Sequence, residues 1–464
     1  MMDESFRDSI ATIDDQGKRK RVYPKRVRGR FATARQRVAY VLLAFLFIGP
    51  WITVGGQPLF LIDVIDRKFV LVGQIFRPAD TFIFVLLMIS GVLSVIVFTV
   101  AFGRIFCGWI CPQTIFLEHV YRKIEYWIEG DRNQQIKLNN GPLNFEKIWK
   151  KGLKNTVFYL IAFAVSNVFL QYLVGTDHWL ELVELGPQAH LGTFSALLIF
   201  SVIFYFVFAW FREQACIVVC PYGRLQGVLL DRNSLVILYD WIRGEPRGKG
   251  KRQENDGKGD CIDCGLCVQV CPTGIDIRNG TQLECVNCTA CIDVCDSVMQ
   301  KVGKDPGLIR FDSVNGVEQG RHNVMTPRAW AYSAILLVLT GVVVLLLATR
   351  SPVETVFLRM EGQLYQMDGS KVVNIYDYTL INKSDEAMQL HFVPEEGSAE
   401  LVLIGGDEIV LEPEEIRHGS AMLKIEREAL VASKVKMKLK VLDAQGNEID
   451  EISTNFLGPL VRKR

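Results

Sequence analysis

The chain has 464 residues, of which 49% are hydrophobic and 22% are charged, with a formal net charge of +1 and a mean hydropathy of +0.20. These values exclude an ordinary soluble enzyme and indicate a membrane protein with water-exposed parts. The near-neutral charge gives no global electrostatic case for nucleic-acid binding. Twelve cysteines stand in tight groups and none follows Cys295, which favours metal or redox chemistry over a scattered disulfide framework.

Five apolar runs predict an α-helical transmembrane bundle. A helix needs about 20 residues to cross the hydrocarbon core, and five runs reach or approach that length: 38–54, 81–102, 156–174, 193–211 and 329–348. The first run follows a long polar arm and lacks the cleavage pattern of a secretory signal. We therefore expect five spans.

Lysine and arginine collect in the N-terminal arm, residues 1–37, and in the loop after the second span. Cytoplasmic flanks carry this excess, so both segments belong in the cytoplasm. The 175–192 loop has three carboxylates and no lysine or arginine, which places it outside. The alternation of the spans places the 55–80 loop outside as well. Five spans then place the C-terminus in the periplasm, whereas a sixth crossing by the amphipathic segment 113–128 would invert this. The basic residues of the arm are explained by their role in setting the membrane topology and by their attraction to anionic membrane lipid.

A glycine-rich and charged linker at 243–260 separates a four-helix membrane region, residues 38–242, from a cysteine-rich segment. Such a composition favours a mobile linker. We expect a cytoplasmic dicluster ferredoxin-like domain at 261–328, followed by the fifth transmembrane helix at 329–348.

Eight cysteines show the bacterial ferredoxin spacing twice: Cys261-Ile-Asp-Cys264-Gly-Leu-Cys267-Val-Gln-Val-Cys271-Pro272 and Cys285-Val-Asn-Cys288-Thr-Ala-Cys291-Ile-Asp-Val-Cys295-Asp296. Three thiolates at this interval hold three corners of a cubane, and a fourth comes from the other motif. The spacing predicts two [4Fe–4S] clusters, one bound by Cys261, Cys264, Cys267 and Cys295 and one by Cys285, Cys288, Cys291 and Cys271. The alternative is structural zinc, which is usually bound by two Cys-x-x-Cys pairs and does not require the third cysteine of each run. Two clusters in so short a segment suggest a path for single electrons.

The other four cysteines form a repeat after the second and fourth spans, Cys107-Gly-Trp-Ile-Cys111-Pro112 and Cys216-Ile-Val-Val-Cys220-Pro221. If the helix continues through each pair, its two sulfurs share one face, and the two pairs could form a four-sulfur redox or copper site. Thiolates suit Cu(I), zinc or iron–sulfur centres, and a pair can also cycle between dithiol and disulfide. The alternative is four small residues that fill helix contacts.

Charged and histidine side chains near the membrane edge are further candidates. His119 could bind copper or iron, and His178 with Asp177 could meet a metal ion outside, although a single histidine of this kind is more often an ordinary interfacial residue. The candidates around the cysteine pairs are Glu118, His119, Arg104, Arg212 and Arg224.

Residues 351–464 carry short alternating segments that predict a two-sheet, immunoglobulin-like sandwich. Strict alternation is clearest from Lys434 to Val441. The domain has no evident catalytic cluster, so it is a docking module or a passive cap. The expected strands are 372–381, 389–393, 400–404, 408–411, 421–426 and 434–442.

Taken together, these features resemble the CcoG/FixG/RdxA family. The likeness lies in the paired Cys-x-x-x-Cys-Pro motifs, the phrase Cys271-Pro-Thr-Gly-Ile-Asp-Ile-Arg278, the Cys295-Asp296 ending and the C-terminal sandwich. All twelve cysteines match the family's pattern. The resemblance implies a bacterial inner-membrane accessory protein for assembly of high-affinity cytochrome c oxidase, which acts as a cupric reductase and supplies Cu(I) to copper delivery proteins such as a copper-transporting P-type ATPase.

On this hypothesis, electrons pass from an unknown electron donor through the two clusters to the membrane cysteines, where Cu(II) is reduced and Cu(I) is held by thiolate. One alternative is a quinol-linked electron-transfer subunit similar to NapH and NosR. A second is a non-catalytic copper-binding assembly scaffold.

Overall fold

The computed structural model describes residues 11–13, 16–64, 67–76, 80–248, 257–320, 325–360, 362, 364–384, 386–395, 399–406, 409–413, 415–430 and 432–459. It divides into two compact units, which are described separately. The membrane unit comprises Met1–Ile52, Pro58–Phe69 and Pro78–Val343, and the sandwich unit comprises Thr53–Gln57, Val70–Arg77 and Val344–Arg464. Part of the predicted linker, residues 249–256, lies outside the described residues.

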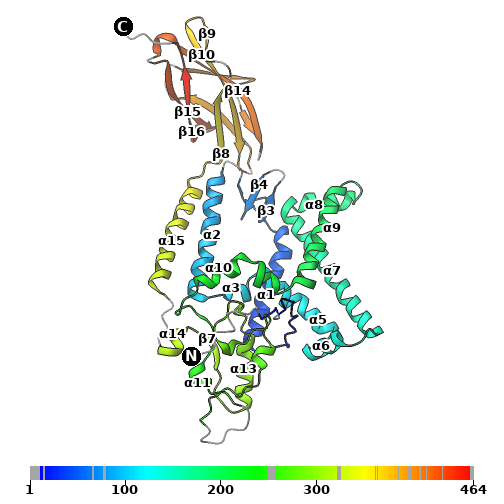
Figure 1. The fold of residues 1–464 in the computed structure, drawn as a ribbon. Helices are drawn as coiled ribbons and strands as arrows, with labels where there is room; N and C mark the ends of the chain where they lie inside the picture. The colour runs from blue at the N-terminus through cyan, green and yellow to red at the C-terminus, as the bar shows by residue number, and fades with distance from the viewer. Residues whose placement is uncertain are drawn as a thin grey trace. The chain divides into compact units, whose positions relative to one another are not determined.

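The five predicted spans are confirmed, because five helices are long and apolar enough to cross a membrane. Two of them begin before their apolar runs, since α1 begins at Arg30 and α7 at Phe145, each in a polar segment that precedes the hydrophobic stretch. The π-helical segment η5 extends α9, and the 3₁₀ turn η2 follows α1. The elements are α1 (Arg30–Ile48), η2 (Gly49–Trp51), α2 (Thr81–Phe102), α7 (Phe145–Val174), α9 (Leu191–Phe206), η5 (Val207–Phe211) and α15 (Pro327–Ala348) (Figure 1).

Short helices and strands form between the long apolar helices. The amphipathic segment 113–128 forms short helices and is not among the five long apolar ones. Its elements are α4 (Pro112–Ile115), the π-helical η4 (Phe116–Tyr121) and α5 (Arg122–Ile128), followed by α6 (Arg132–Asn140). The two predicted outside loops contain β1 (Thr53–Val54), β2 (Gln57–Pro58), β3 (Phe60–Asp63), β4 (Lys68–Leu71), β5 (Gln74–Phe76) and α8 (Thr176–Leu185).

The cysteine motifs belong to a small folded region at 236–312, which we call the cysteine region. Strand β6 pairs antiparallel with β7, from Val236 opposite Asp312 to Tyr239 opposite Ile309. β6 lies before the predicted start of the domain at 261, so the domain begins earlier than expected. The sequence did not indicate this, because a four-residue apolar run does not reveal that it pairs with a distant strand. The elements are β6 (Val236–Tyr239), α11 (Trp241–Gly244), α12 (Leu266–Gln269), η7 (Ile277–Asn279), α13 (Ala290–Lys301) and β7 (Ile309–Asp312), with α14 (Val314–Gln319) after them.

The C-terminal residues form the predicted sandwich of two antiparallel sheets. One sheet has the order β12-β14-β10-β8, with β9 paired to β10, and the other has the order β13-β11-β15-β16. The strands are β8 (Val353–Arg359), β9 (Gln366–Asp368), β10 (Lys371–Asn382), β11 (Met388–Pro394), β12 (Ala399–Ile404), β13 (Ile409–Leu411), β14 (Ile416–Glu426), β15 (Lys434–Asp443) and β16 (Glu448–Leu457), with the 3₁₀ turn η8 (Arg427–Ala429) between β14 and β15.

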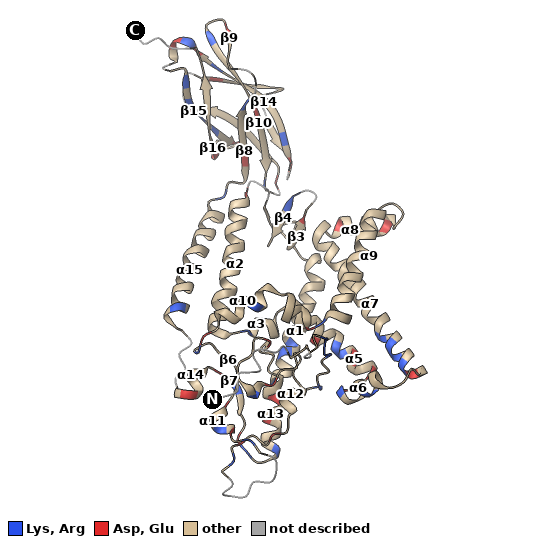
Figure 2. Cartoon of the chain, viewed as in Figure 1, with Lys and Arg blue, Asp and Glu red and all other residues tan. Residues whose placement is uncertain are grey.

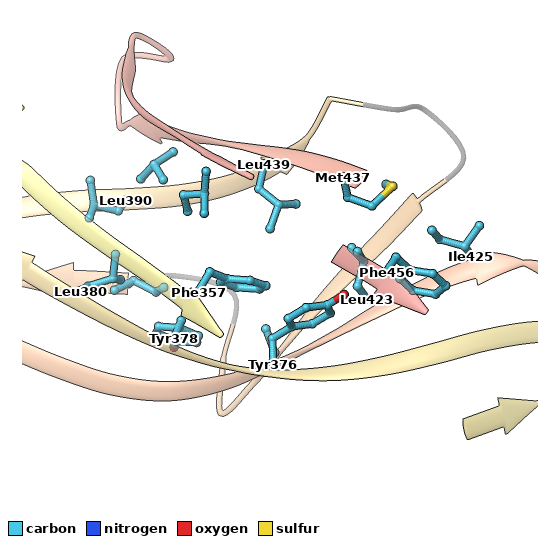
Figure 3. Close-up of a cluster of buried hydrophobic side chains, with 14 of the residues drawn as sticks. Phe357, Tyr376, Tyr378, Leu380, Leu390, Leu423, Ile425, Met437, Leu439 and Phe456 are labelled. Carbon is cyan, nitrogen blue, oxygen red and sulfur yellow. The ribbon is translucent and has the colours of Figure 1, made fainter. Parts of the chain in front are cut away.

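Side chains from both sheets fill one continuous apolar core. Phe357 and Tyr376 stack with ring centroids 4.9 Å apart, and Leu439 comes from the facing sheet (Figure 3). The alternation in β15 is confirmed, since Met437, Leu439 and Val441 are fully buried. The predicted strands did not include β8, β9 or β16. β9 has only three residues, and acidic side chains interrupt the apolar pattern of β8 and β16.

Candidate redox site

The eight cysteines of the cysteine region line two cavities, and each cavity combines cysteines of both motifs. The first cavity is lined by Cys261, Cys264, Cys267 and Cys295, together with apolar residues such as Tyr239 and Leu308. The second is lined by Cys271, Cys285, Cys288 and Cys291, and Cys267 also touches it. Each motif therefore contributes its fourth cysteine to the cavity of the other motif, an arrangement suited to a pair of iron–sulfur clusters.

The chemistry of these two cavities fits a [4Fe–4S] cluster, because the four cysteines expected to bind its iron atoms line each cavity. Burial raises the pKa of the Cys285 and Cys295 thiols to about 12. Thiols in such surroundings lose their protons when a metal binds them. A [4Fe–4S] cluster would supply one-electron storage at each position.

Positive φ angles shape the backbone at the cluster motifs. Asp263, Asn287 and Thr289 are non-glycine residues in the left-handed region, at φ 52°, 52° and 65°. Each stands within or beside a Cys-x-x-Cys turn, where the chain must fold tightly around its cavity. Such a backbone is costly and persists where the surrounding structure fixes it.

The two membrane-edge motifs have matching geometry, and the helix does not continue through either cysteine pair. Cys107 lies in α3 (Ile105–Trp109), whereas Cys111 is extended at φ −56° and ψ 126°. Likewise, Cys216 lies in the π-helical η6 (Ala215–Val219) and Cys220 is extended at φ −66° and ψ 111°. The following proline disfavours helical backbone at the second cysteine and begins a new helix. These new helices are α4 and α10 (Pro221–Leu229).

The four membrane-edge thiols nevertheless converge. Burial raises the pKa of Cys216 to about 12, and the charges of Cys111, Cys107 and Cys220 each add to the rise. The sulfurs of the other three cysteines therefore lie within electrostatic reach of Cys216. We call this group, Cys107, Cys111, Cys216 and Cys220, the membrane-edge site.

A buried arginine stands between this site and the cysteine region. Arg104 is 4% exposed, and its Nε donates to Gln226 Oε1 at 2.8 Å. Cys107 Sγ donates to the same oxygen at 3.1 Å. Burial raises the pKa of Cys107, Cys216 and Cys285, and Arg104 opposes that rise in all three. One guanidinium thus acts on thiols of both groups.

The membrane-edge site packs directly against the second cysteine cavity. Cys107 shares a buried apolar cluster with Val286 and Cys288. A Cβ atom at Gly108 would lie 2.4 Å from the Val286 carbonyl oxygen, so only glycine allows this close approach. Gly103, with φ +61°, likewise approaches the Leu235 carbonyl oxygen. No intervening element therefore separates Cys107 from the second cluster motif.

A buried network of charges joins the membrane helices to the cysteine region. Arg212 donates to both carboxylate oxygens of Glu125, at 2.6 and 3.0 Å. Arg122 contacts Glu118 and Glu213 and donates to the Pro272 carbonyl oxygen at 3.0 Å. Charged residues surround α5 and α6, whereas α2 has none along its length (Figure 2).

The N-terminal arm also belongs to this network. Arg19 pairs with Glu213 at 3.1 Å and Arg21 with Glu125 at 3.3 Å. Asp293, between Cys291 and Cys295, accepts hydrogen bonds from Phe31 N at 3.2 Å and Ala32 N at 2.7 Å. A residue of the second cluster motif thus caps the first transmembrane helix. The arm therefore has a packing role that topology and lipid attraction alone did not predict.

The other predicted candidates divide into two groups. Glu118, His119 and Arg212 lie in the buried network, and burial together with Arg35 lowers the pKa of His119 to about 3. The His119 ring is therefore neutral, and its Nε2 accepts from Arg35 Nε at 3.2 Å. Arg224 and Asp177 are exposed, and exposed His178 pairs with Glu181 at 3.2 Å.

Sequence reasoning missed Gln226, Asn287 and Arg35. Gln226 is fully buried, which its place on a short helix of mixed polarity did not show. Asn287 lies inside the second motif and Arg35 donates to the Cys288 carbonyl oxygen at 2.6 Å. The available signals were a polar residue between two cluster cysteines and an arginine just before the first apolar run.

Comparison with known families matches both groups of cysteines. The model of a 4Fe-4S binding domain matches residues 84–133, and that of a 4Fe-4S dicluster domain matches residues 211–314. The first range holds Cys107 and Cys111, and the second holds the other ten cysteines. The immunoglobulin-like fold at the C-terminus of FixG matches residues 343–459.

Similar proteins cover most of the chain. Protein RdxB of Cereibacter sphaeroides is 35% identical over 80% of this chain and 81% of its own length. Nitrogen fixation protein FixG of Rhizobium meliloti is 36% identical over 64% of this chain and 58% of its own length. Ferredoxin-type protein NapH of Haemophilus influenzae is 25% identical over 52% of this chain and 87% of its own length. The chain therefore belongs to the FixG/RdxA family, as its motifs predicted, and is a membrane-associated iron–sulfur electron-transfer protein.

Proposed function

We propose that this protein is a cupric reductase that passes single electrons from two [4Fe–4S] clusters to Cu(II) at the membrane-edge site. The first cluster is held by Cys261, Cys264, Cys267 and Cys295, and the second by Cys271, Cys285, Cys288 and Cys291. When bound, each reduced cluster would supply one electron, which converts one Cu(II) to Cu(I). The resulting Cu(I) suits the soft thiolates of Cys107, Cys111, Cys216 and Cys220.

The observation that carries this proposal is the packing of Cys107 against Cys288 and Val286. It brings a thiol of the membrane-edge site into the same buried cluster as a ligand of the second cluster. Electrons leaving that cluster toward the membrane therefore meet the four converging thiols first. A metal substrate bound there needs no further redox group to receive them.

The buried Arg104 supports an anionic membrane-edge site. A buried cation is costly unless a negative group compensates it. Arg104 donates to the neutral Gln226 amide and also interacts with the Cys107 thiol, while its Nη1 has no hydrogen-bond partner among the described residues. Thiolates that bind a copper ion would supply the missing negative charge. The same reasoning admits an iron centre at these cysteines, which the copper experiment below separates from a copper site.

The proposed setting is the bacterial inner membrane, with the arm and the clusters cytoplasmic and the sandwich periplasmic. Support comes from the lysine and arginine excess in the arm and after α2. Free thiols also persist on the reducing side. The proposed partners are a copper-transporting P-type ATPase and high-affinity cytochrome c oxidase, with the sandwich as a docking module.

The test is anaerobic reoxidation of the clusters by copper. Protein reduced with dithionite and then freed of it receives Cu(II) in the presence of a Cu(I)-specific chelator, while cluster absorbance is followed. We expect one Cu(I) for each cluster electron lost. Joint Cys107→Ser and Cys216→Ser substitution should abolish Cu(I) formation and leave cluster absorbance intact.

Val219→Ser provides the matched control, because Val219 lies between Cys216 and Cys220 but is 61% exposed. It should reduce copper as the unmodified protein does. Copper reduction that survives the double cysteine substitution would remove the membrane-edge site from the mechanism.

Quinol-linked electron transfer is the second candidate, favoured by the likeness to NapH. In that case the reduced clusters would stay reduced with Cu(II) but would be reoxidised by a soluble quinone analogue. The same dithionite-reduced preparation distinguishes the two functions.

A further inference from the structure

A cavity of about 640 Å³ lies beside the second cluster motif. Its walls come from the N-terminal arm at 24–29, the first turns of α1, the η4 and α5 segment, and the loops that carry Pro272 and Cys288. The arm is the dark blue segment beside α5 in Figure 1. This volume lies within the range of roughly 300–1,000 Å³ that is typical of small-molecule and cofactor sites.

Two residues line both this cavity and the cavity of the second cluster. They are Pro272 and Cys288. Cys288 is only 8% exposed, and Arg35 holds its carbonyl oxygen at 2.6 Å. A molecule in the larger cavity would therefore be separated from the cluster by the thickness of one residue. We call this cavity the arm cavity.

The lining of the arm cavity is strongly basic. Five cationic side chains face one carboxylate: Lys25, Arg26, Arg28, Arg35 and Lys123 against Glu118. That carboxylate is already engaged by Arg122. Lys25, Arg26 and Arg28 are exposed, so their charges remain available. Guanidinium groups gathered in this way suit a phosphate, which they can bind through charge-assisted hydrogen bonds.

Aromatic side chains complete the wall. Tyr126 and Trp127 both line the cavity. Tyr126 is fixed by its hydroxyl, which donates to the Pro24 carbonyl oxygen at 3.0 Å, and Trp127 is 79% exposed. Aromatic faces of this kind stack on flat ring systems. The arm cavity thus offers phosphate contacts and a flat apolar contact at one site.

We propose that the arm cavity binds a reduced flavin nucleotide, which donates electrons to the second cluster past Cys288. This rests on the proposed function, since it names the donor for the same electron path. An uncharged quinol would make no use of the exposed charges of Lys25, Arg26 and Arg28. A reduced nicotinamide nucleotide transfers a hydride, whereas clusters accept single electrons.

The stoichiometry of this step is balanced. A reduced flavin that becomes fully oxidised releases two electrons, and its protons pass to solvent. Each of the two clusters accepts one electron, the first cluster by way of the second. No other reductant is needed.

The probe is flavin mononucleotide, with riboflavin as the analogue that lacks the phosphate. Binding to the full-length protein in phosphatidylcholine nanodiscs is measured by quenching of flavin fluorescence, and electron entry by bleaching of the clusters with photoreduced flavin. We expect the mononucleotide to bind at least about tenfold more tightly than riboflavin. Joint Arg26→Glu and Arg28→Glu substitution should remove that preference while cluster absorbance stays intact.

Joint Lys434→Glu and Lys436→Glu substitution, on exposed positions of β15, changes the net charge equally and should leave binding unchanged. If the double arginine variant fails to load its clusters, Arg28→Gln should still weaken mononucleotide binding. Equal affinity for both flavins, or unchanged binding in the arginine variants, would overturn the proposal. Loss of flavin binding on addition of phosphatidylglycerol would assign the cations to lipid headgroups and overturn it too.

The flavin experiment and the copper experiment can fail independently of each other. Dithionite reduces the clusters without the arm cavity, so arginine variants should still form Cu(I) after chemical reduction. If the unmodified protein binds flavin mononucleotide and bleaches with it but forms no Cu(I), the donor site stands and the cupric reductase fails.

Discussion

The cysteine region and the C-terminal sandwich are built on different kinds of core. The sandwich core consists of apolar and aromatic side chains from both sheets, among them Phe357, Leu380 and Leu439. The core of the cysteine region instead includes Cys261 and Cys267 among its buried members and surrounds two cavities. A polypeptide can complete the first core by itself, whereas the second needs a cofactor to fill it.

Charge is also distributed differently in the two units. In the sandwich, ion pairs such as Lys371 with Glu400 lie on the exposed surface. In the membrane unit, Arg212 and Glu125 are almost fully buried and paired. Exposed pairs contribute little to stability, whereas removing one member of a buried pair is costly. The membrane unit therefore depends on cofactors and buried charges, and the sandwich depends on apolar packing.

Removal of iron should have the largest effect, and it should unfold the cysteine region but not the sandwich. A chelator under denaturing pretreatment, followed by refolding without iron, should leave the cysteine region unfolded, because its core then lacks the clusters. The sandwich should keep its fold. Hydrogen exchange followed by mass spectrometry would read both regions in one sample. Equal protection of the cysteine region with and without iron would contradict the comparison.

Substitution of Glu125 by glutamine should have the next largest effect. It leaves the buried Arg212 without its principal carboxylate, at a cost of about 3–5 kcal/mol in the free energy of unfolding of the membrane unit. Glu146→Gln, which removes an exposed pair with Lys150, is the control and should cause no measurable change. Thermal unfolding in detergent would compare them, and similar stabilities would show that burial of the pair does not matter.

The same carboxylate predicts a pH dependence. Burial would raise the pKa of Glu125, but Arg212, Lys154 and Arg21 lower it from 4.5 to about 2. Because the pKa is lower in the folded protein, the stabilisation is fully present above pH 4.5 and is lost as the pH falls toward 2. The Glu125→Gln variant should lack this part of the acid sensitivity. Identical acid unfolding curves would contradict the assignment.

Leu439→Ala should weaken the sandwich without affecting the clusters. Leu439 is fully buried between the sheets, and its truncation should cost about 2–5 kcal/mol. Thermal unfolding should show an earlier transition of the sandwich, while iron content and cluster absorbance stay unchanged. A loss of clusters would show that the two units do not fold independently.

Asp293→Ala should have the smallest effect, because it removes a helix cap. The backbone N–H groups of Phe31 and Ala32 would lose their acceptor, at a cost of about 0.5–2 kcal/mol. Hydrogen exchange at the start of α1 should rise. Ser313→Ala, which removes the cap of α14, should leave α1 unchanged. Unaltered exchange in the aspartate variant would contradict a capping role.

The sequence by itself determined the elements whose signal is local. Apolar length identifies α2 and α15, period-two alternation identifies β15, and cysteine spacing identifies the ferredoxin-like motifs, because each pattern lies within one continuous segment. The proline after Cys111 and the proline after Cys220 are also local signals, because each marks the point where one helix ends and the next begins.

Only the tertiary structure decided which distant segments meet. It brought Arg104 and Gln226 to the membrane-edge thiols, paired β6 with β7, and placed Asp293 at the start of α1. It also folded the basic arm over buried carboxylates to form the arm cavity. These contacts join residues far apart in the chain, and each depends on burial and charge compensation that no single segment reveals.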